Sequence, residues 1–351
     1  MESFNKFIIN KKHLLENISA IKKQLNNGVL LCACIKANAY SLSAKEVAKI
    51  IENEVDYFAV SCVQEAIEIR NELKNARILI LGRVLKEYYS YCAENHFEIS
   101  ISSVSDLKNI KLKQPLCVHF ALNTGMNRYG FSSEKEINKA LNIINKNDNL
   151  KLVGAFSHFA YSKNNIETTK QYEKFVGFKA LFPNNILFSI SASGCYDLLN
   201  FQENMVRVGL NMFLGSESSP NSAIEIKSKI VFSFKVKKGE KIGYDCTFVA
   251  QKDMQIGVVP LGYADGIPRG LSNCGSVVIS NRLAKIVGLV CMDCFMIDLT
   301  NIKAKENQEV IVLGQSKNQS ISIYDWAKLT NDSPYCLLTN LKYNRCNYIT
   351  Q

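Results

Sequence analysis

The sequence of 351 residues lacks several features that mark special classes of protein. It has no low-complexity tract and no stretch that approaches about 18 consecutive apolar residues, and its first ten residues lack the apolar core of a signal peptide. The net charge of +10 comes from scattered lysines, without a dense basic block or interleaved aromatic residues. These absences argue against a membrane span, secretion and nucleic-acid binding, so we expect a cytoplasmic protein with a solvated surface.

The twelve cysteines show neither a disulfide framework nor a zinc-binding pattern. Without a secretory signal they are best interpreted as reduced thiols, and Cys32, Cys34 and Cys117 lie in apolar runs of strand length. Cys291 and Cys294 form a CxxC pair, but no second pair follows at zinc-ribbon spacing, and the Met-Asp between them continues an alternating strand pattern. We therefore expect neither a metal site nor a redox role for this pair.

One stretch stands out, the segment VLLCACIKANAY from Val29 to Tyr40. It is apolar and uncharged until Lys36 and then turns polar, which is typical of a strand that is buried on both faces and carries an amine at its C-terminal end. Two interpretations of Lys36 stay open at this point. In one, the strand simply ends and the lysine extends into water. In the other, the amine lies in a partly desolvated mouth, where it can form a Schiff base with a carbonyl.

After a short strand near Phe7 and a helix from about Lys12 to Leu25, strands and helices alternate regularly. The helix-like segments Val63 to Leu73 and Glu134 to Ile144 have the clearest periodicity. The predicted strands are Val29 to Ile35, Tyr57 to Ser61, Ile78 to Leu81, Phe97 to Ile101, Leu116 to Leu122, Leu152 to Ser157, Ile186 to Ser191 and Met205 to Val208. Eight strands with intervening helices over about 200 residues favour an α/β fold of the (β/α)8 TIM-barrel type over an open sheet.

Beyond about Pro220 the helices stop, and the remaining runs are separated by turn residues, which is typical of a mostly antiparallel β domain. One short helix near Ile323 to Leu329 interrupts it. We predict a barrel over residues 11–220 and a β domain over residues 221–351, which the N-terminal strand within residues 1–10 joins. The predicted strands of this domain are Ile230 to Val236, Gln255 to Pro260, Ser276 to Ile279, Lys285 to Val290, Phe295 to Leu299 and Glu309 to Leu313.

The barrel predicts where the chemistry lies, because enzymes of this fold carry their active sites at the C-terminal ends of the strands. Polar side chains and glycines follow five of the predicted strands at this rim: Lys36 and Tyr40, then Arg128, then His158, then Ser193 and Gly194, and finally Arg207 with Gly209. Singly, each has a structural explanation, such as a buried histidine or a helix cap. Together they predict a site.

The composition of the rim indicates a ligand. Gly194, Gly209 and Leu210 offer backbone N–H groups beside predicted helix starts, the place where barrels often hold a phosphate. A phosphate close to a lysine that can form an imine points to pyridoxal phosphate.

Seven motifs occur in order along the chain: IKANAY (Ile35 to Tyr40), LNTGMNRYG (Leu122 to Gly130), AFSHFA (Ala155 to Ala160), MVRVGL (Met205 to Leu210), PLGYADG (Pro260 to Gly266), VCMD (Val290 to Asp293) and YCLLTNL (Tyr335 to Leu341). Together they resemble alanine racemase, the fold-type III pyridoxal-phosphate-dependent family in which a barrel is followed by a β domain. The resemblance covers nearly the whole chain. It implies an isomerase that acts as a homodimer with shared active sites.

The resemblance also implies two catalytic bases. Lys36 would bind the cofactor covalently and act on one face of the substrate, and Tyr263 of the partner subunit would act on the opposite face. Two bases suit a racemase, which removes a proton from one face of Cα and returns it on the other. Arg207 would face the pyridine nitrogen and hydrogen-bond His158, which would contact the tyrosine.

Binding roles follow from the same resemblance. Arg128 and the main-chain N–H of Met292 of the partner subunit would bind the substrate carboxylate. The cofactor phosphate would be surrounded by Tyr40, Ser193, Gly209, Leu210 and Tyr335.

Four positions depart from the family pattern. Ala121 stands where the family often has a carbamylated lysine whose negative charge orients the arginine, so we expect a chloride or another anion beside Arg128. Ser41 replaces the first glycine of KANAYGHG, and a serine there can start a helix, so we expect the fold to survive. Leu289 replaces an arginine before the VCMD-type motif, and Ala192 replaces an asparagine before the phosphate serine.

We predict a racemase that interconverts L- and D-alanine and supplies D-alanine for peptidoglycan. Because the departures lie near the substrate entry or the cofactor pocket, a broad or serine-preferring racemase stays an alternative. An alternative from another class is a non-catalytic pyridoxal-phosphate-binding barrel, which would keep Lys36 but lack a second base. Such proteins are single barrels, so the β domain that carries Tyr263 argues against it.

Overall fold

The computed structural model describes residues 3–161, 166–190, 193–198, 201–216 and 219–351. The chain divides into two compact units, one of which is Ile18–Met212, while the other joins the chain up to Asn17 with Phe213–Gln351. The two divisions fall within helices α1 (Lys11–Lys22) and α8 (Leu210–Leu214). The domain boundaries expected from the sequence, between residues 10 and 11 and between residues 220 and 221, stay a prediction. Among the described helices, none combines the length and apolar character that crossing a bilayer requires.

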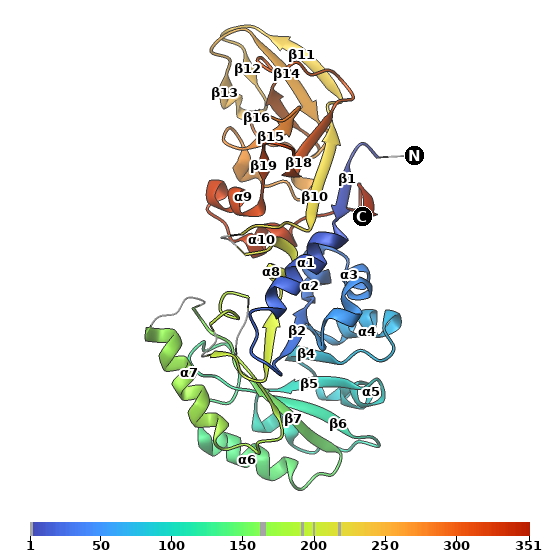
Figure 1. Ribbon diagram of the computed structural model, residues 1–351, viewed down its shortest axis with the longest axis vertical. Coiled ribbons are helices and arrows are strands. Elements are labelled where there is room, and N and C mark those ends of the chain that lie inside the picture. Colours follow the sequence, from blue (N-terminus) through green and yellow to red (C-terminus); the bar gives the residue numbers. More distant parts are fainter. Residues whose placement is uncertain (1–2, 162–165, 191–192, 199–200, 217–218) are drawn as a thin grey trace. The chain divides into compact units, whose positions relative to one another are not determined.

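The unit Ile18–Met212 is built on parallel strands with the hydrogen-bonded order β8-β7-β6-β5-β4-β3-β2-β9. The strands are β2 (Leu30–Cys34), β3 (Tyr57–Val60), β4 (Ile78–Arg83), β5 (Phe97–Ile101), β6 (Leu116–Ala121), β7 (Leu150–Phe156), β8 (Leu187–Ser189) and β9 (Met205–Val208). Its helices are α2 (Lys36–Ser41), α3 (Ala44–Ile51), α4 (Val63–Glu72), α5 (Tyr89–Glu94), α6 (Glu134–Ile144) and α7 (Ile166–Lys179). Figure 1 shows α3, α4 and α5 on one side of these strands and α6 and α7 on the other. The predicted (β/α)8 barrel is confirmed.

Burial explains why these runs form strands of a barrel. Every residue of β3, β5 and β9 is buried, as expected where helices cover the outer face of a sheet and side chains fill its interior. β8 and β9 stand at the two ends of the hydrogen-bonded order, and side chains join them. The Asn204 carboxamide accepts from the Phe188 N–H, and Arg207 donates to the Ser189 hydroxyl. This closure brings the segment after β8 beside the segment after β9.

The other unit is a mostly antiparallel sheet with the order β11-β14-β17-β16-β15-β18-β10-β1-β20. The strands are β1 (Lys6–Ile9), β10 (Ile224–Lys229), β11 (Phe232–Val236), β14 (Met254–Val259), β15 (Ser276–Ile279), β16 (Arg282–Val287), β17 (Phe295–Asp298), β18 (Glu309–Gln315) and β20 (Asn347–Thr350). Shorter elements are β12 (Lys241–Ile242), β13 (Phe248–Val249), β19 (Ser320–Ile321), α9 (Ile323–Thr330) and α10 (Pro334–Thr339). β1 pairs with β10 and β20, which confirms that the N-terminal strand joins this sheet.

Two details of this unit differ from the sequence predictions. Strand β10 was missed, although its residues alternate between buried and half-buried side chains, which is the period-two signal of a strand. Met292 and Asp293 were expected inside a strand, but they lie in the turn between β16 and β17. The alternating pattern was misleading there because it continues across the turn into β17.

Candidate active site

Lys36 lies at the C-terminal end of β2, the end at which barrel enzymes carry their chemistry. β2 is apolar and buried as far as Ile35, whose N–H still donates to Ala59 in the neighbouring strand, and Lys36 is exposed. The side chain thus leaves the barrel interior at its rim. This position is compatible with both interpretations of Lys36, and the residues around Lys36 decide between them.

The backbone after Lys36 has an unusual conformation. Ala37, Asn38, Ala39 and Tyr40 all have φ between 52° and 58°, in the left-handed region, and none of them is glycine. Such a conformation costs roughly 1–2 kcal/mol per residue, so surrounding contacts must hold it. As a result, Tyr40 is turned inward and only 5% exposed.

Two side chains hold this left-handed segment. The Glu65 carboxylate accepts from the Ala37 N–H at 2.7 Å and from the Ser61 N–H at 2.7 Å. The Asn38 carboxamide oxygen accepts from the Ala44 N–H at 2.7 Å, where α3 begins. The fold survives the serine at position 41, as expected, but Ser41 does not start the helix: α3 begins at Ala44, whose N–H bonds Asn38, and Ser41 has φ 67°.

The strain at Ser41 leads to a stability prediction. Ser41→Gly should raise the free energy of unfolding by about 1 kcal/mol, because glycine adopts positive φ without the clash that Cβ causes. Ser19→Gly, in the interior of α1, is the matched control and should lower it by about 0.5–1 kcal/mol. Urea unfolding of both variants measures the difference. A Ser41→Gly variant no more stable than the parent would show that the backbone there is not strained.

Tyr40, Ser193 and Gly209 meet at the rim. The Gly209 N–H donates to the Ser193 hydroxyl at 2.8 Å, which links the segments after β8 and β9. A Cβ placed on Gly209 would lie 2.1 Å from the Tyr40 hydroxyl oxygen, so the phenol contacts the bare backbone of the glycine. Leu210 follows and begins α8. Four of the residues predicted to surround a phosphate are thus brought together.

This contact predicts the effect of a side chain at position 209. Gly209→Ala should weaken pyridoxal phosphate binding by at least about tenfold, because the added methyl displaces the Tyr40 phenol from the cradle. Adding Tyr40→Phe should recover part of the loss, because it removes the nearest atom. Gly177→Ala, where a Cβ meets nothing within 4 Å, is the control and should bind the cofactor normally. Equal cofactor affinity in all three proteins would contradict this account of the cradle.

Arg207 is the buried cation of the site. It projects from β9, is 4% exposed, and donates to the Ser157 carbonyl at 2.6 Å and to the Ser189 hydroxyl. Its guanidinium carbon lies 5.2 Å from the centre of the Phe156 ring. The predicted hydrogen bond to His158 is not among the contacts of the described residues, and it stays a prediction.

The pKa of His158 is lowered by its surroundings. Burial and the positive charges of Arg207, Arg128 and Lys36 together lower the pKa of His158 to about 3. The imidazole is therefore neutral throughout the physiological range. His158 and Arg128 line the same small cavity, and Arg207 donates to the carbonyl of the adjacent Ser157, so these three rim residues lie close together.

Arg128 lies in a loop whose backbone is held by the Asn123 side chain. The Asn123 carboxamide oxygen accepts from the Gly125 and Asn127 N–H groups, which folds the NTGMN segment after β6. Arg128 is exposed, stacks 5.0 Å from the Tyr129 ring centre, and lines a small cavity that Ala121 and His158 also line. The anion was expected because a buried charge needs a partner, but the Arg128 guanidinium is exposed in the single chain. The anion therefore stays a prediction, which applies where Arg128 is covered.

The remaining predicted residues belong to the β unit. Tyr263, Met292 and Tyr335 are 43%, 53% and 43% exposed, which leaves them available to another molecule. The Tyr263 N–H donates to the Cys291 carbonyl at 3.0 Å, so the tyrosine is attached to the turn that carries Met292. Tyr335 lies in α10. The structure groups Tyr263 with Met292, and it groups the barrel residues separately; that the two groups form one site stays a prediction.

An ion-pair network that the sequence analysis missed supports the β-unit group. The buried Asp265 accepts from Arg345 at 2.9 and 2.7 Å and from the Gly262 N–H at 2.9 Å, and Arg345 also bonds Asp293 at 2.5 Å. These two carboxylates raise the pKa of the Arg345 guanidinium. Asp265 is part of the PLGYADG motif and could have been singled out, whereas Arg345 carries no motif.

The structure says less about the other two positions that depart from the family pattern, Leu289 and Ala192. Leu289 is half-buried just beyond β16, and its carbonyl accepts from the Cys291 thiol at 3.5 Å. Ala192 lies outside the described residues.

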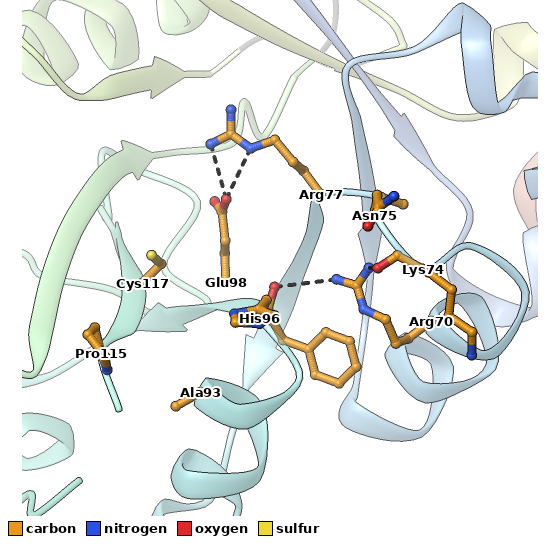
Figure 2. A pocket seen from close by; sticks show the side chains of 11 residues that line it. Arg70, Lys74, Asn75, Arg77, Ala93, His96, Glu98, Pro115 and Cys117 are labelled. Carbon is orange, nitrogen blue, oxygen red and sulfur yellow. Dashed lines mark hydrogen bonds and ion pairs between the residues drawn. The ribbon is translucent and has the colours of Figure 1, made fainter. Parts of the chain in front are cut away.

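A different cavity, of about 330 Å³, lies at the opposite end of the barrel strands, before β4, β5 and β6. Figure 2 shows Arg77 beside Glu98 in this cavity; the Arg77 Nη2 and Glu98 Oε1 atoms are 3.1 Å apart. The other Glu98 oxygen bonds the His119 ring at 2.5 Å. None of the predicted site residues lines this cavity, and residues at this end of a barrel usually serve stability.

Comparisons with known proteins agree with the architecture, a barrel followed by an antiparallel β unit. A family model described as alanine racemase, N-terminal domain, matches residues 9–217, and one described as alanine racemase, C-terminal domain, matches residues 223–349. An alanine racemase from Fusobacterium nucleatum is 36% identical over 303 residues, which cover 82% of this chain and 84% of that protein.

Solved structures show the same fold. The crystal structure of alanine racemase from E. faecalis has a TM-score of 0.93 at 26% identity and covers 99% of this chain and 98% of that one. Alanine racemase from Bartonella henselae, solved with covalently bound pyridoxal phosphate, has a TM-score of 0.88 at 23% identity and covers 99% of both chains. Fold and motifs together define an amino-acid racemase of the pyridoxal-phosphate-dependent class. The chain belongs to the alanine racemase family.

Proposed function

We propose that this chain interconverts L- and D-alanine by a two-base mechanism, with Lys36 on one face of the substrate and Tyr263 of the partner subunit on the other. The observation that carries the proposal is the geometry of the C-terminal rim of the barrel, where His158 and Arg128 line one cavity, Arg207 donates to the carbonyl of the adjacent Ser157, and Lys36 lies at the end of β2. The Fusobacterium nucleatum relative, named alanine racemase, supports the substrate.

The barrel residues fit pyridoxal phosphate as cofactor. The fit is tested by the cradle at Gly209, where any Cβ would collide with the Tyr40 hydroxyl and where the Gly209 N–H meets the Ser193 hydroxyl. These groups suit a phosphate, and Lys36 supplies the amine that attaches the aldehyde. When bound, pyridoxal phosphate acidifies the Cα–H of an attached amino acid by delocalising the charge that proton removal leaves. Tyr335 would complete the phosphate site.

Arg207 limits the chemistry that follows. Arg207 would face the ring nitrogen of the cofactor, and because a guanidinium does not give up its proton, that nitrogen would stay unprotonated. The buried arginine is held by hydrogen bonds to the Ser157 carbonyl and the Ser189 hydroxyl. Arg207 would therefore limit the stabilisation of charge at Cα, which would suppress side reactions.

Tyr263 needs help to act as a base, because a free tyrosine titrates near 10. Cationic neighbours favour the phenolate. In the proposed shared site these would be Lys36, Arg207 and Arg128 of the opposite subunit, acting with His158 as a neutral hydrogen-bonding partner. In the single chain Tyr263 is 43% exposed, as expected of a group that completes the site of another subunit.

A homodimer follows from this division of labour. Lys36 belongs to the barrel unit and Tyr263 to the β unit, and we propose that the β domain, residues 221–351 with the N-terminal strand, contributes to the active site of the partner. Arg128 and the partner's Met292 N–H would hold the substrate carboxylate. The product D-alanine would serve peptidoglycan synthesis in the cytoplasm.

The experiment is turnover of L-alanine and of L-serine by the purified protein with added pyridoxal phosphate, with each D-enantiomer quantified. The proposal predicts strong conversion of alanine and weak conversion of serine. Dominant conversion of serine would identify a serine-preferring racemase, and cofactor binding without conversion of either would indicate a non-catalytic barrel protein.

A further inference from the structure

Two thiols lie at the ends of the turn that carries Met292. Cys291 and Cys294 flank Met292 and Asp293 in the connection between β16 and β17, and the Cys291 N–H donates to the Cys294 carbonyl at 2.9 Å. Both residues line the same cavity. This pair was expected to have no redox role because it was placed inside a strand, and that reason no longer holds.

The geometry suits a disulfide. A tight turn brings the first and fourth Cα atoms within about 7 Å, and disulfides span about 4.4–6.8 Å between Cα atoms. Both residues are half-buried, and both line an open cavity of about 500 Å³, so a small reagent can reach them. Among the described residues no cluster of three or more His, Cys, Asp or Glu could hold a metal ion. Oxidation is therefore a better match for this pair than metal binding.

A second pair of neighbouring cysteines, Cys32 and Cys34, is less suited to forming a disulfide. Cys32 and Cys34 lie two residues apart along β2, and both are buried inside the barrel. Residues two apart in a strand have Cα atoms about 6.6–6.8 Å apart, at the limit for a disulfide. Closure there would bend a buried strand, whereas closure at the β16–β17 turn moves a surface segment.

The turn is mechanically connected to the proposed catalytic tyrosine. The Tyr263 N–H bonds the Cys291 carbonyl at 3.0 Å, and the Ala264 N–H bonds the Met292 carbonyl at 3.1 Å. Gly262 packs so closely that a Cβ on it would lie 2.1 Å from the Met292 carbonyl oxygen. A shift of the turn therefore moves the segment that begins with Tyr263.

We propose that Cys291 and Cys294 form a reversible disulfide by exchange with a low-molecular-weight disulfide, and that this oxidation lowers catalysis by displacing Met292 and Tyr263. The loss of catalysis rests on the function proposed above, whereas formation of the disulfide does not. Closure brings the two sulfurs to about 2.05 Å from each other. A displacement of about 1 Å near reacting groups can cost about a hundredfold in rate.

The exchange proceeds in two balanced steps. The Cys291 thiolate attacks one sulfur of the reagent RSSR, an S–S bond forms to Cys291, and RS⁻ leaves. The Cys294 thiolate then attacks the Cys291 sulfur of this mixed disulfide, and the second RS⁻ leaves. The two thiol protons pass to the released thiolates, so the protein loses two electrons and two protons and RSSR becomes two RSH.

The test incubates the holoenzyme with glutathione disulfide and maps disulfides by peptide mass spectrometry alongside activity. We expect an internal Cys291–Cys294 disulfide and a loss of racemisation of at least about tenfold that dithiothreitol reverses. A variant that lacks both thiols, Cys291→Ser with Cys294→Ser, should keep its activity under the same treatment. Cys274→Ser, which removes an exposed thiol of the same unit, is the matched control and should be inactivated like the parent.

Three results would overturn the proposal. The first is a reduced Cys291–Cys294 pair in a sample whose exposed Cys246 is glutathionylated. The second is complete disulfide formation with unchanged activity. The third is equal inactivation of the parent and of the variant that lacks both thiols, which would assign the effect to another thiol. If the reduced enzyme racemises no amino acid, the proposed function fails, and peptide mapping still decides whether the disulfide forms.

Discussion

Lys36→Ala should reduce racemisation in both directions by at least about a thousandfold and abolish covalent attachment of pyridoxal phosphate. The loss is large because one side chain supplies both the cofactor's attachment and the base on one face. Lys36 is exposed at the end of β2, so its truncation leaves no cavity, and the free energy of unfolding of the cofactor-free protein should change by less than about 0.5 kcal/mol. Turnover of both enantiomers, with urea unfolding of the cofactor-free protein, measures the two effects.

Lys45→Ala provides the matched control for this variant, since Lys45 is an exposed lysine in α3 of the same unit. It should keep full activity and bind the cofactor covalently. Substantial racemisation by Lys36→Ala, at normal stability, would refute the role of Lys36 and leave the interpretation of a lysine that merely extends into water.

Tyr263→Phe should lower racemisation by about a hundredfold to ten-thousandfold, since it removes general acid–base catalysis on one face only. The cofactor should still attach to Lys36. In deuterated water the variant should still exchange the Cα proton of one enantiomer through Lys36, without inverting it. Proton exchange followed by NMR, beside formation of the opposite enantiomer, separates the two faces.

Tyr88→Phe, at an exposed tyrosine of the barrel unit, is the control and should behave like the parent. If Tyr263→Phe kept full two-way racemisation, the second base would be another group. If it lost proton exchange on both faces, Tyr263 would act through cofactor binding and not as a base.

The barrel was predictable because its strands are buried on both faces. The apolar run Tyr57–Val60 matches the predicted strand Tyr57 to Ser61 to within one residue, and Phe97–Ile101 matches the observed strand although Glu98 and Ser100 interrupt its apolar residues. The rim positions were predictable for the same reason, since the C-terminal end of a strand is fixed once the strand is known. Lys36 and Arg207 lie where these strands placed them, and that they form one site with His158 stays a prediction.

Other features depend on contacts that local sequence patterns do not encode. The left-handed segment from Ala37 to Tyr40 runs against the intrinsic preference of every residue in it, and Glu65 holds it from a helix further along the chain. The pairing of Arg345 with Asp265 joins positions 80 apart in sequence. By contrast, α10 was missed although Ser333 and Pro334 carry a start signal, a cap followed by proline.

The most direct test of the central claim, a site shared by two subunits, is to mix the Lys36→Ala and Tyr263→Phe proteins under conditions in which subunits exchange. A heterodimer would contain one site with intact Lys36 and the partner's intact Tyr263, so random mixing should restore about a quarter of the parent activity. If mixing restored nothing although exchange was complete, Lys36 and Tyr263 would not act across a subunit interface, and the shared site would be refuted.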